Sequence, residues 1–344
     1  MKKIIVIALI CLFGFTSRLF VFQSQHPDTD ELFELRNMQR LTPTDVLKRT
    51  TFYGDHTSFP GEYLIHLAPM AALNMFNKPA DLSYEDGTIG VKKHEFWILS
   101  MPKIIISLTA FYLFWLMCGN FLSTTLGFIV AFLMISLNAT LIYHSFSLRP
   151  YGILPELAII NLYLSSRKNN EKNFSLFHGT IILFTCIYHA YGILIAFLPL
   201  IFFKPQRHEN IILVNVAAVI MWVYYASYNT FGVTPNHVQS VVDPFQFITK
   251  ENFLNGIIDA LFSGSLLTVA SLTLVMIGAA RADHSEILFL LILVLLPLTL
   301  IILVDIKTSY WIHPRQFCWI IPALAIWCGK MADKCSIPDP TRTK

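Results

Sequence analysis

About ten apolar runs, separated by short polar stretches, are the feature that most constrains how this chain can fold. The runs cover residues 4–22, 96–118, 121–143, 151–166, 174–188, 191–203, 211–228, 266–280, 287–304 and 317–327. Hydrophobic residues make up 55% of the 344 residues, charged residues 14%, and the mean hydropathy is +0.57. A water-soluble core of this length does not need so much apolar surface. The sequence therefore predicts an all-α, polytopic membrane bundle of about ten transmembrane segments, in a single domain over residues 1–344.

Several of these runs are shorter than the roughly 20 residues that cross a bilayer as a straight helix. Residues 174–203 are either two short spans or one re-entrant pair broken at 189–192, and both alternatives return the chain to the side from which it started. The first run follows two lysines and has no small-x-small cleavage site after it, so we expect an uncleaved signal anchor.

Basic residues at the ends of the runs predict which loops share a side of the membrane. With a cytoplasmic N-terminus, about half of the 25 lysines and arginines fall in short cytoplasmic loops and in the C-terminal tail, as the positive-inside rule requires. The outer side then receives the loops 23–95, 146–152, 189–192, 229–263 and 305–316. Both termini are therefore predicted to be cytoplasmic, and every motif with unusual chemistry faces outward.

The long first outer loop, residues 23–95, is predicted to carry helices on the membrane surface. Leu32, Leu35 and Met38 have helical spacing, and 61–76 is an apolar helix of about 15 residues. Such a helix is too short to span easily and too apolar to leave the membrane, so we expect it to lie along the surface.

Composition and motifs exclude several classes of function. The net charge of +3 is small and dispersed, which argues against a nucleic-acid partner. The six cysteines lie in or beside apolar runs and offer neither a disulfide framework nor a CxxC metal site. There is no HExxH, GxSxG, Walker or GxGxxG motif. His56 and His66 lack the spacing of a helical zinc pair and are expected to be surface or packing residues.

Asp28, Asp30 and Glu31 form a group of carboxylates directly after the first run. Their place beside a membrane would tune their pKa values, as in an active site. The alternative is a helix N-terminus, where such residues cap the helix and favour its dipole. Asp28 and Asp30 also have the D-x-D spacing in which two carboxylates can share a divalent cation such as Mg²⁺ or Mn²⁺, although nothing in the sequence requires a metal.

Cations and aromatic residues recur at the later outward turns. Arg149 is predicted at the mouth of a helix that begins near Pro150, with Glu156 about two turns deeper. The other turns carry His189, Tyr191, His313 and Arg315. Taken singly, each of these residues is also typical of a membrane interface. Together they predict a site for an anionic substrate that enters from the bilayer, because arginine offers a planar fork of donors suited to phosphate.

The order of these motifs resembles that of the GT-C membrane glycosyltransferases, in the branch of the protein O-mannosyltransferases, aminoarabinose transferases and lipopolysaccharide-core transferases. The residues that carry the resemblance are Asp30-Glu31, Gly54-Asp55-His56, Glu95-Phe96 with Pro102, Ser145 to Tyr151, His189 to Gly192, and Arg315 with Pro322. They extend over almost the whole chain in the family's order.

The resemblance implies an inverting glycosyltransferase of a bacterial inner membrane with its active site on the periplasmic face. Its donor would be a sugar on a polyprenyl phosphate, and its acceptor a glycan, a lipid or a protein. Asp30 would be the general base, supported by Glu31, and Arg149 and Arg315 would hold the donor phosphate. The implied substrate-binding residues are Tyr151, His189, Tyr191, His313, Glu95, Asp55 and His56. No cofactor is required.

Two other functions fit part of the pattern. A transporter or flippase of an anionic lipid or glycan would also need outward cations and an intramembrane Glu156, but transporters place such groups near the midplane of repeated halves. A polysaccharide polymerase would be expected to carry a large later outer loop, and 229–263 is moderate in length.

Overall fold

A computed structural model describes residues 2–24, 35, 38, 42–44, 60–76, 93–169, 171–205, 209–231, 253–263, 265–308 and 314–336. Every regular element in these ranges is helical, which confirms the predicted all-α class. The elements are α1 (Lys2–Ser24), α4 (Pro60–Ala72), α5 (Lys93–Phe121), α6 (Thr125–Leu137), α7 (Ala139–His144), η3 (Pro150–Gly152), α8 (Leu154–Ser166), α9 (Lys172–Tyr188), α10 (Gly192–Phe203), α11 (Asn210–Phe231), α12 (Phe253–Phe262), α13 (Ser265–Ala279), α14 (His284–Leu290), η5 (Leu291–Leu295), α15 (Leu296–Thr308), η6 (Pro314–Ile320) and α16 (Ile321–Ser336).

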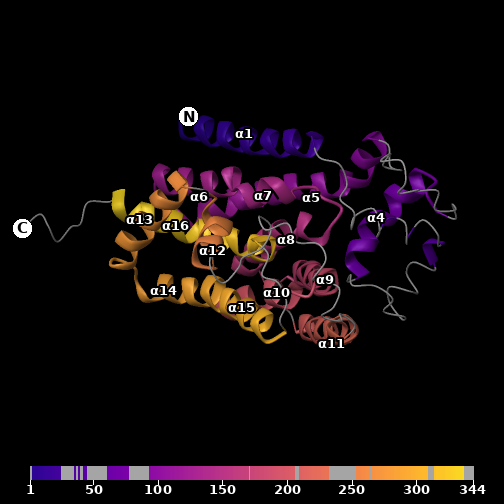
Figure 1. Ribbon diagram of the computed structural model, residues 1–344. Coiled ribbons are helices and arrows are strands. Elements are labelled where there is room, and N and C mark those ends of the chain that lie inside the picture. Colours follow the sequence, from indigo (N-terminus) through magenta and orange to yellow (C-terminus); the bar gives the residue numbers. More distant parts are fainter. Residues whose placement is uncertain are drawn as a thin grey trace, which may run out of the picture.

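The helices form an elongated bundle with two distinct ends (Figure 1). α1 lies along α6 and α7, and α16 packs on α6, α8 and α13 in the interior. The start of α1 and the end of α16 lie at one end of the bundle, and α4 lies at the other, packed on α5 and α9. We call these the α16 end and the α4 end.

Close packing of α6 on α16 fixes the α16 end. The carboxylate of Asp333 accepts hydrogen bonds from the backbone N–H of Ser123 at 2.6 Å and from that of Thr124 at 3.0 Å. It also accepts from the Thr124 hydroxyl at 2.5 Å, and this hydroxyl caps α6. Gly127 and Gly329 face each other where the two helices meet. A buried carboxylate therefore ties the last helix to the turn between α5 and α6.

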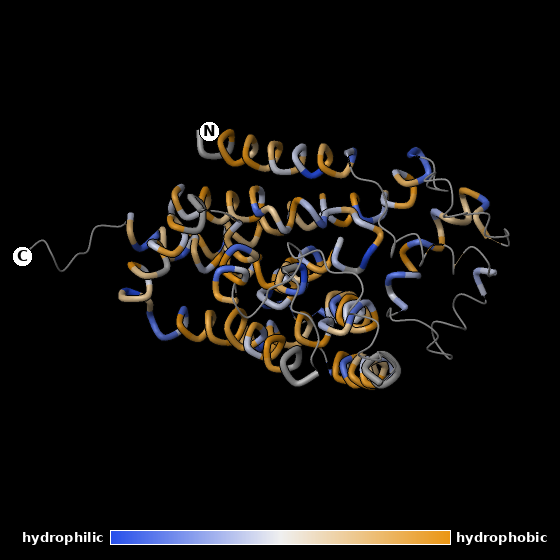
Figure 2. Tube along the Cα trace, viewed as in Figure 1, coloured by the Kyte–Doolittle hydropathy of each residue, from blue (hydrophilic) through white to orange (hydrophobic). Residues whose placement is uncertain are grey.

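The outer surface of the bundle is strongly apolar, and Figure 2 shows this along α1, α14 and α15. Phe20 on α1 is 72% exposed and Leu213 on α11 is 74% exposed. Among the described residues, three helical segments are long and apolar enough to cross a membrane: Ile5–Ser24, Lys93–Phe121 and His284–Leu303. Exposed side chains of this kind are suited to contact with lipid.

The predicted number of about ten transmembrane segments is not confirmed, because several apolar runs fold as short helices. α6 has 13 residues and α10 has 12, below the length that crosses a bilayer as a straight helix. The run 121–143 is divided at Asn138, whose side chain caps α7 by accepting from the N–H of Leu141. Residues 174–203 form two helices, α9 and α10, with a turn at His189.

The expected helix near Pro150 begins later than predicted. Pro150–Gly152 is a single 3-10 turn, and α8 starts at Leu154 with Pro155 in its first turn, where a missing N–H costs nothing. Glu156 therefore lies in the first turn of α8 rather than two turns deep. The prediction was wrong because the sequence offers two prolines, and the second one is at the helix start.

α4 confirms that an apolar helix forms in the region where 61–76 was expected to be helical. It has 13 residues, it tolerates Pro69 near its end, and seven of its residues are buried. Met70 and Tyr63 pack with Phe96 and Leu99 of α5. α4 is therefore docked against the bundle through one face, at the end where the candidate site lies.

Candidate functional site

Three connections meet at the α4 end and carry the polar residues singled out in the sequence. The first runs from Ser145, which ends α7, to the start of α8, and its 3-10 turn closes with a hydrogen bond from the N–H of Gly152 to the oxygen of Arg149 at 3.0 Å. The second is the turn between α9 and α10, where His189 is extended. The third is the start of η6, which carries Arg315.

Ring contacts join these three connections. The guanidinium of Arg315 lies over the ring of Tyr151, with 4.9 Å from Cζ to the ring centroid. The centroid of Tyr151 is 5.3 Å from that of His189, and the His189 centroid is 4.9 Å from that of Tyr191. Tyr191 in turn lies 6.1 Å from Trp319 on η6. Residues distant in sequence therefore form a continuous aromatic surface with a cation above it.

His189 is held in its neutral form by burial and by the charges of two arginines. Its Nδ1 accepts a hydrogen bond from the N–H of Tyr191 at 3.1 Å, so Nε2 carries the proton of the neutral ring. Burial lowers the pKa of His189 to about 3; Glu62 acts to raise it, and Arg149 and Arg315 lower it further. Both arginines are therefore within electrostatic range of this ring. We call Arg149, Tyr151, His189, Tyr191 and Arg315 the arginine–aromatic cluster.

Two donors, one in this cluster and one next to it, have no acceptor within the described part of the chain. They are the buried Nε of Arg315 and the buried indole Nε1 of Trp319. An unpaired buried donor costs free energy, so such groups are normally paired with water or a ligand. The guanidinium of Arg315, which has an unpaired donor and lies over an aromatic ring, can bind a phosphate or carboxylate.

Glu156 borders a small cavity under the cluster. It is 6% exposed, its Oε1 accepts from the Ser107 hydroxyl at 3.1 Å, and its Oε2 has no partner among the described residues. The cavity has a volume of about 10 Å³ and is also lined by Ser145 and Tyr151, which leaves room for one water molecule. The buried Arg18 lies beside it, with its Nε donating to the Ser145 hydroxyl at 3.0 Å.

Glu62 and Lys103 form a buried ion pair that sequence reasoning missed. The Lys103 Nζ is 2.5 Å from Glu62 Oε1, His66 Nε2 is 2.9 Å from the same oxygen, and the Tyr188 hydroxyl donates to Oε2. Burial acts to raise the pKa of Glu62, but Lys103 and His66 outweigh it and lower the pKa to about 2. The signal was present in the sequence: both are ionisable residues in apolar runs, the same criterion that singled out Glu156.

Several predicted site residues lie outside the described part of the chain. They are Asp28, Asp30, Glu31, Asp55, His56 and His313. Glu95 is half-buried in the first turn of α5. Within the ranges that the structure describes, no group of three or more histidine, cysteine or acidic side chains is arranged to hold a metal ion.

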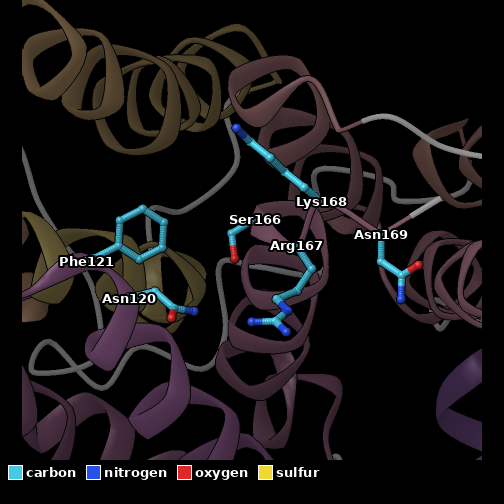
Figure 3. Close-up of a pocket in the computed structure, with 6 residues that line it drawn as sticks. All are labelled: Asn120, Phe121, Ser166, Arg167, Lys168 and Asn169. Atoms are coloured by element: carbon cyan, nitrogen blue, oxygen red, sulfur yellow. The ribbon is translucent and has the colours of Figure 1, made fainter.

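A large open pocket lies at the α16 end, away from the arginine–aromatic cluster. It has a volume of about 570 Å³ and is lined by Asn120, Phe121, Ser166, Arg167, Lys168 and Asn169. Figure 3 shows the side chains of Arg167 and Lys168 pointing apart, so the two cations do not converge on one point. Arg167 also lies over the ring of Tyr163, at 5.8 Å. These exposed cations are of the kind that the positive-inside rule places in a short loop.

No protein-family model, curated protein or solved structure matches this chain.

Proposed function

We propose that this protein is a membrane glycosyltransferase of the GT-C type. It would take a sugar from a polyprenyl-phosphate donor and transfer it, with inversion, to a glycan, lipid or protein acceptor. The observation that carries the proposal is the arginine–aromatic cluster, in which the guanidinium of Arg315 lies over the ring of Tyr151 and that ring contacts the ring of His189. The order of the sequence motifs around these residues supports the same assignment.

A phosphate is the anion that best fits this arrangement. Its oxygens can accept from the Nε of Arg315 and from the Trp319 indole, and the positive charge of Arg149 acts on the same region through its effect on His189. The Glu62 carboxylate does not compete with the phosphate for the arginines, because Glu62 is already bound by Lys103, His66 and Tyr188. The leaving group gains negative charge in the transition state, so cations fixed at this point would accelerate transfer as well as bind the donor.

The proposed step uses a general base from the first outer loop. Asp30 would accept the proton of the acceptor hydroxyl while the hydroxyl oxygen attacks the anomeric carbon. The bond from that carbon to the phosphate oxygen breaks, and the electron pair leaves with the polyprenyl phosphate. Glu31 would orient the acceptor. Such a step inverts the anomeric configuration, because attack and departure occur on opposite faces of the sugar.

The proposed membrane arrangement has about ten segments, with both termini cytoplasmic and the α4 end periplasmic. It is supported by the lysines at the α16 end, where Lys334 lies 2.5 Å from Glu286 at the start of α14. Arg281 and Lys168 lie in the connections at the same end. A basic end opposite the arginine–aromatic cluster agrees with the positive-inside rule.

A transfer assay with a panel of polyprenyl-phosphate sugars tests the function. We expect the full-length chain in detergent or membranes to incorporate sugar from one donor, and Asp30→Asn to abolish incorporation with insertion intact. Glu171→Gln, which removes an exposed carboxylate before α9, is the matched control and should transfer at the wild-type rate. A wild-type rate in Asp30→Asn would refute the assignment of the base. Binding of the lipid without transfer from any donor would favour a transporter.

A further inference from the structure

Lys103 has used all of its hydrogen-bonding capacity inside the protein. Its ammonium group donates to Glu62 Oε1 at 2.5 Å, to the backbone oxygen of Ser147 at 2.6 Å and to that of Arg149 at 2.9 Å. A lysine has three N–H donors, and its side chain here is fully buried. Lys103 is therefore not available to bind a substrate, although it lies beside the arginine–aromatic cluster.

Two of the acceptors of Lys103 belong to the connection that presents Arg149. The 3-10 turn that follows Ser147 and Arg149 begins at Pro150, and the Arg149 oxygen also accepts from the N–H of Gly152. Charge-assisted bonds to two oxygens in one short connection restrict its backbone strongly. The ammonium group of Lys103 on α5 thus fixes the backbone of Arg149, and with it the direction in which the Arg149 side chain extends.

Glu62 makes the corresponding contact to the second connection. Its Oε2 accepts from the hydroxyl of Tyr188, the residue before His189. An independent contact lies one residue earlier, because a Cβ on Gly61 would be 2.6 Å from the Tyr188 Cα. Only glycine allows α4 to approach the backbone of α9 this closely. α4 therefore holds the end of α9 by a side-chain bond and by direct backbone contact.

We infer that Lys103 and Glu62 are positioning residues that set the spacing between Arg149 and His189, an inference that rests on the proposed function. One ion pair reaches both connections: Lys103 holds the Arg149 side and Glu62 holds the Tyr188 side. The pair is neutral as a whole, so it adds no net charge to attract or repel the donor phosphate. The pair acts by fixing the positions of the residues that would bind the phosphate, and a site with two arginines requires such fixed spacing.

Binding of undecaprenyl phosphate to the full-length chain in detergent tests this inference. The variant Glu62→Met/Lys103→Met replaces the ion pair with apolar side chains, a change that folded proteins often tolerate. We expect its dissociation constant to rise by about tenfold or more, as for the loss of one charge-assisted hydrogen bond. The fraction of protein able to bind should stay at the wild-type level. Purely structural damage would instead lower that fraction and leave the dissociation constant unchanged.

Matched variants separate this inference from the function on which it rests. Arg149→Gln should lose binding, and Arg167→Gln at the α16 end should bind as the wild type does. If Arg149→Gln loses binding while the double variant keeps the wild-type dissociation constant, the positioning role is refuted and the phosphate site stands. If the wild type binds no undecaprenyl phosphate and transfers no sugar, the proposed function fails. Glu62→Gln/Lys103→Gln carries the same expectation should the methionine variant not insert.

Discussion

The guanidinium of Arg315 lies over the ring of Tyr151, with its Cζ 4.9 Å from the ring centroid. This contact connects η6, near the C-terminal end of the chain, with the turn that precedes α8. It holds the guanidinium against the aromatic surface of the cluster, where its remaining N–H groups can donate to a ligand. The buried Nε of Arg315 has no acceptor among the described residues, as expected for a donor that binds a ligand.

Arg315→Lys should therefore weaken the binding of undecaprenyl phosphate by about tenfold, although the charge is kept. A lysine ammonium is a point charge without the planar fork, and it cannot stack on Tyr151 in the same way. Titration of the purified protein in detergent measures the effect. Arg167→Lys is the matched control, because Arg167 also lies over a tyrosine ring but at the α16 end. Equal affinities for wild type and Arg315→Lys would exclude a phosphate fork at this position.

The all-helical class could be predicted because hydrophobic runs report directly on burial in lipid or in a core. Helix boundaries were less predictable, since the interruption at Asn138 and the late start of α8 depend on capping and on which of two prolines begins the helix. The number of spans could not be derived, because one apolar run does not always fold as one helix. The run 121–143 is divided between α6 and α7, and neither is long enough to cross a bilayer as a straight helix.

The candidate site was only partly predictable for a different reason. Arg149, His189 and Arg315 stand out in the sequence because each lies at a turn between apolar runs. Glu62 and Lys103 lie 41 residues apart inside such runs, and nothing local shows that they form a pair. Their importance comes from tertiary packing of α4 on α5, which brings opposite charges together in a buried place.

Gly127→Ala should destabilise the bundle by about 1–3 kcal/mol, the usual cost of overpacking. A Cβ at this position would lie 2.1 Å from Asp333 Oδ1 and 2.7 Å from the backbone oxygen of Gly329. Asp333 cannot move away without losing its bonds to Ser123 and Thr124. Thermal unfolding in detergent measures the change. In Gly119→Ala the added methyl meets no atom within 4 Å and alanine favours the helix, so its unfolding temperature should equal or slightly exceed that of the wild type.

His189 should make the protein less stable as the pH falls from 7 to 5. Burial lowers the pKa of His189 to about 3, whereas in the unfolded chain the ring takes up a proton near pH 6.5. Between these values the unfolded state binds more protons, so stability is present above pH 6.5 and is lost as the pH falls toward 3. Glu62, with its pKa lowered to about 2, adds a further loss only below about pH 4.5.

The unfolding temperature measured at pH 7, 6 and 5 checks this expectation. In His189→Gln, which keeps a hydrogen-bonding side chain without titrating, the fall between pH 7 and 5 should be shallower. His94→Gln is the control, since His94 is exposed in the first turn of α5 and should leave the fall unchanged. If the unfolding temperatures of wild type and His189→Gln fell equally with pH, the pKa of His189 would be the same in the folded and unfolded chain.

Cysteines introduced near the two ends of α5 should react with thiol reagents from opposite sides of a membrane. The helix has 29 residues, which corresponds to about 43 Å and exceeds the roughly 30 Å of the hydrocarbon core. Lys93 is exposed at its start, and the exposed Lys168 lines the pocket beside its last residue, Phe121. In sealed vesicles of known orientation, we expect a membrane-impermeant maleimide to label Lys93→Cys from the outer face only. Lys168→Cys should be labelled only after the vesicles are opened, and the unmodified chain gives the background from its native cysteines. If both positions reacted from the same face, α5 would not span the bilayer, and the α4 end could not be the outer one.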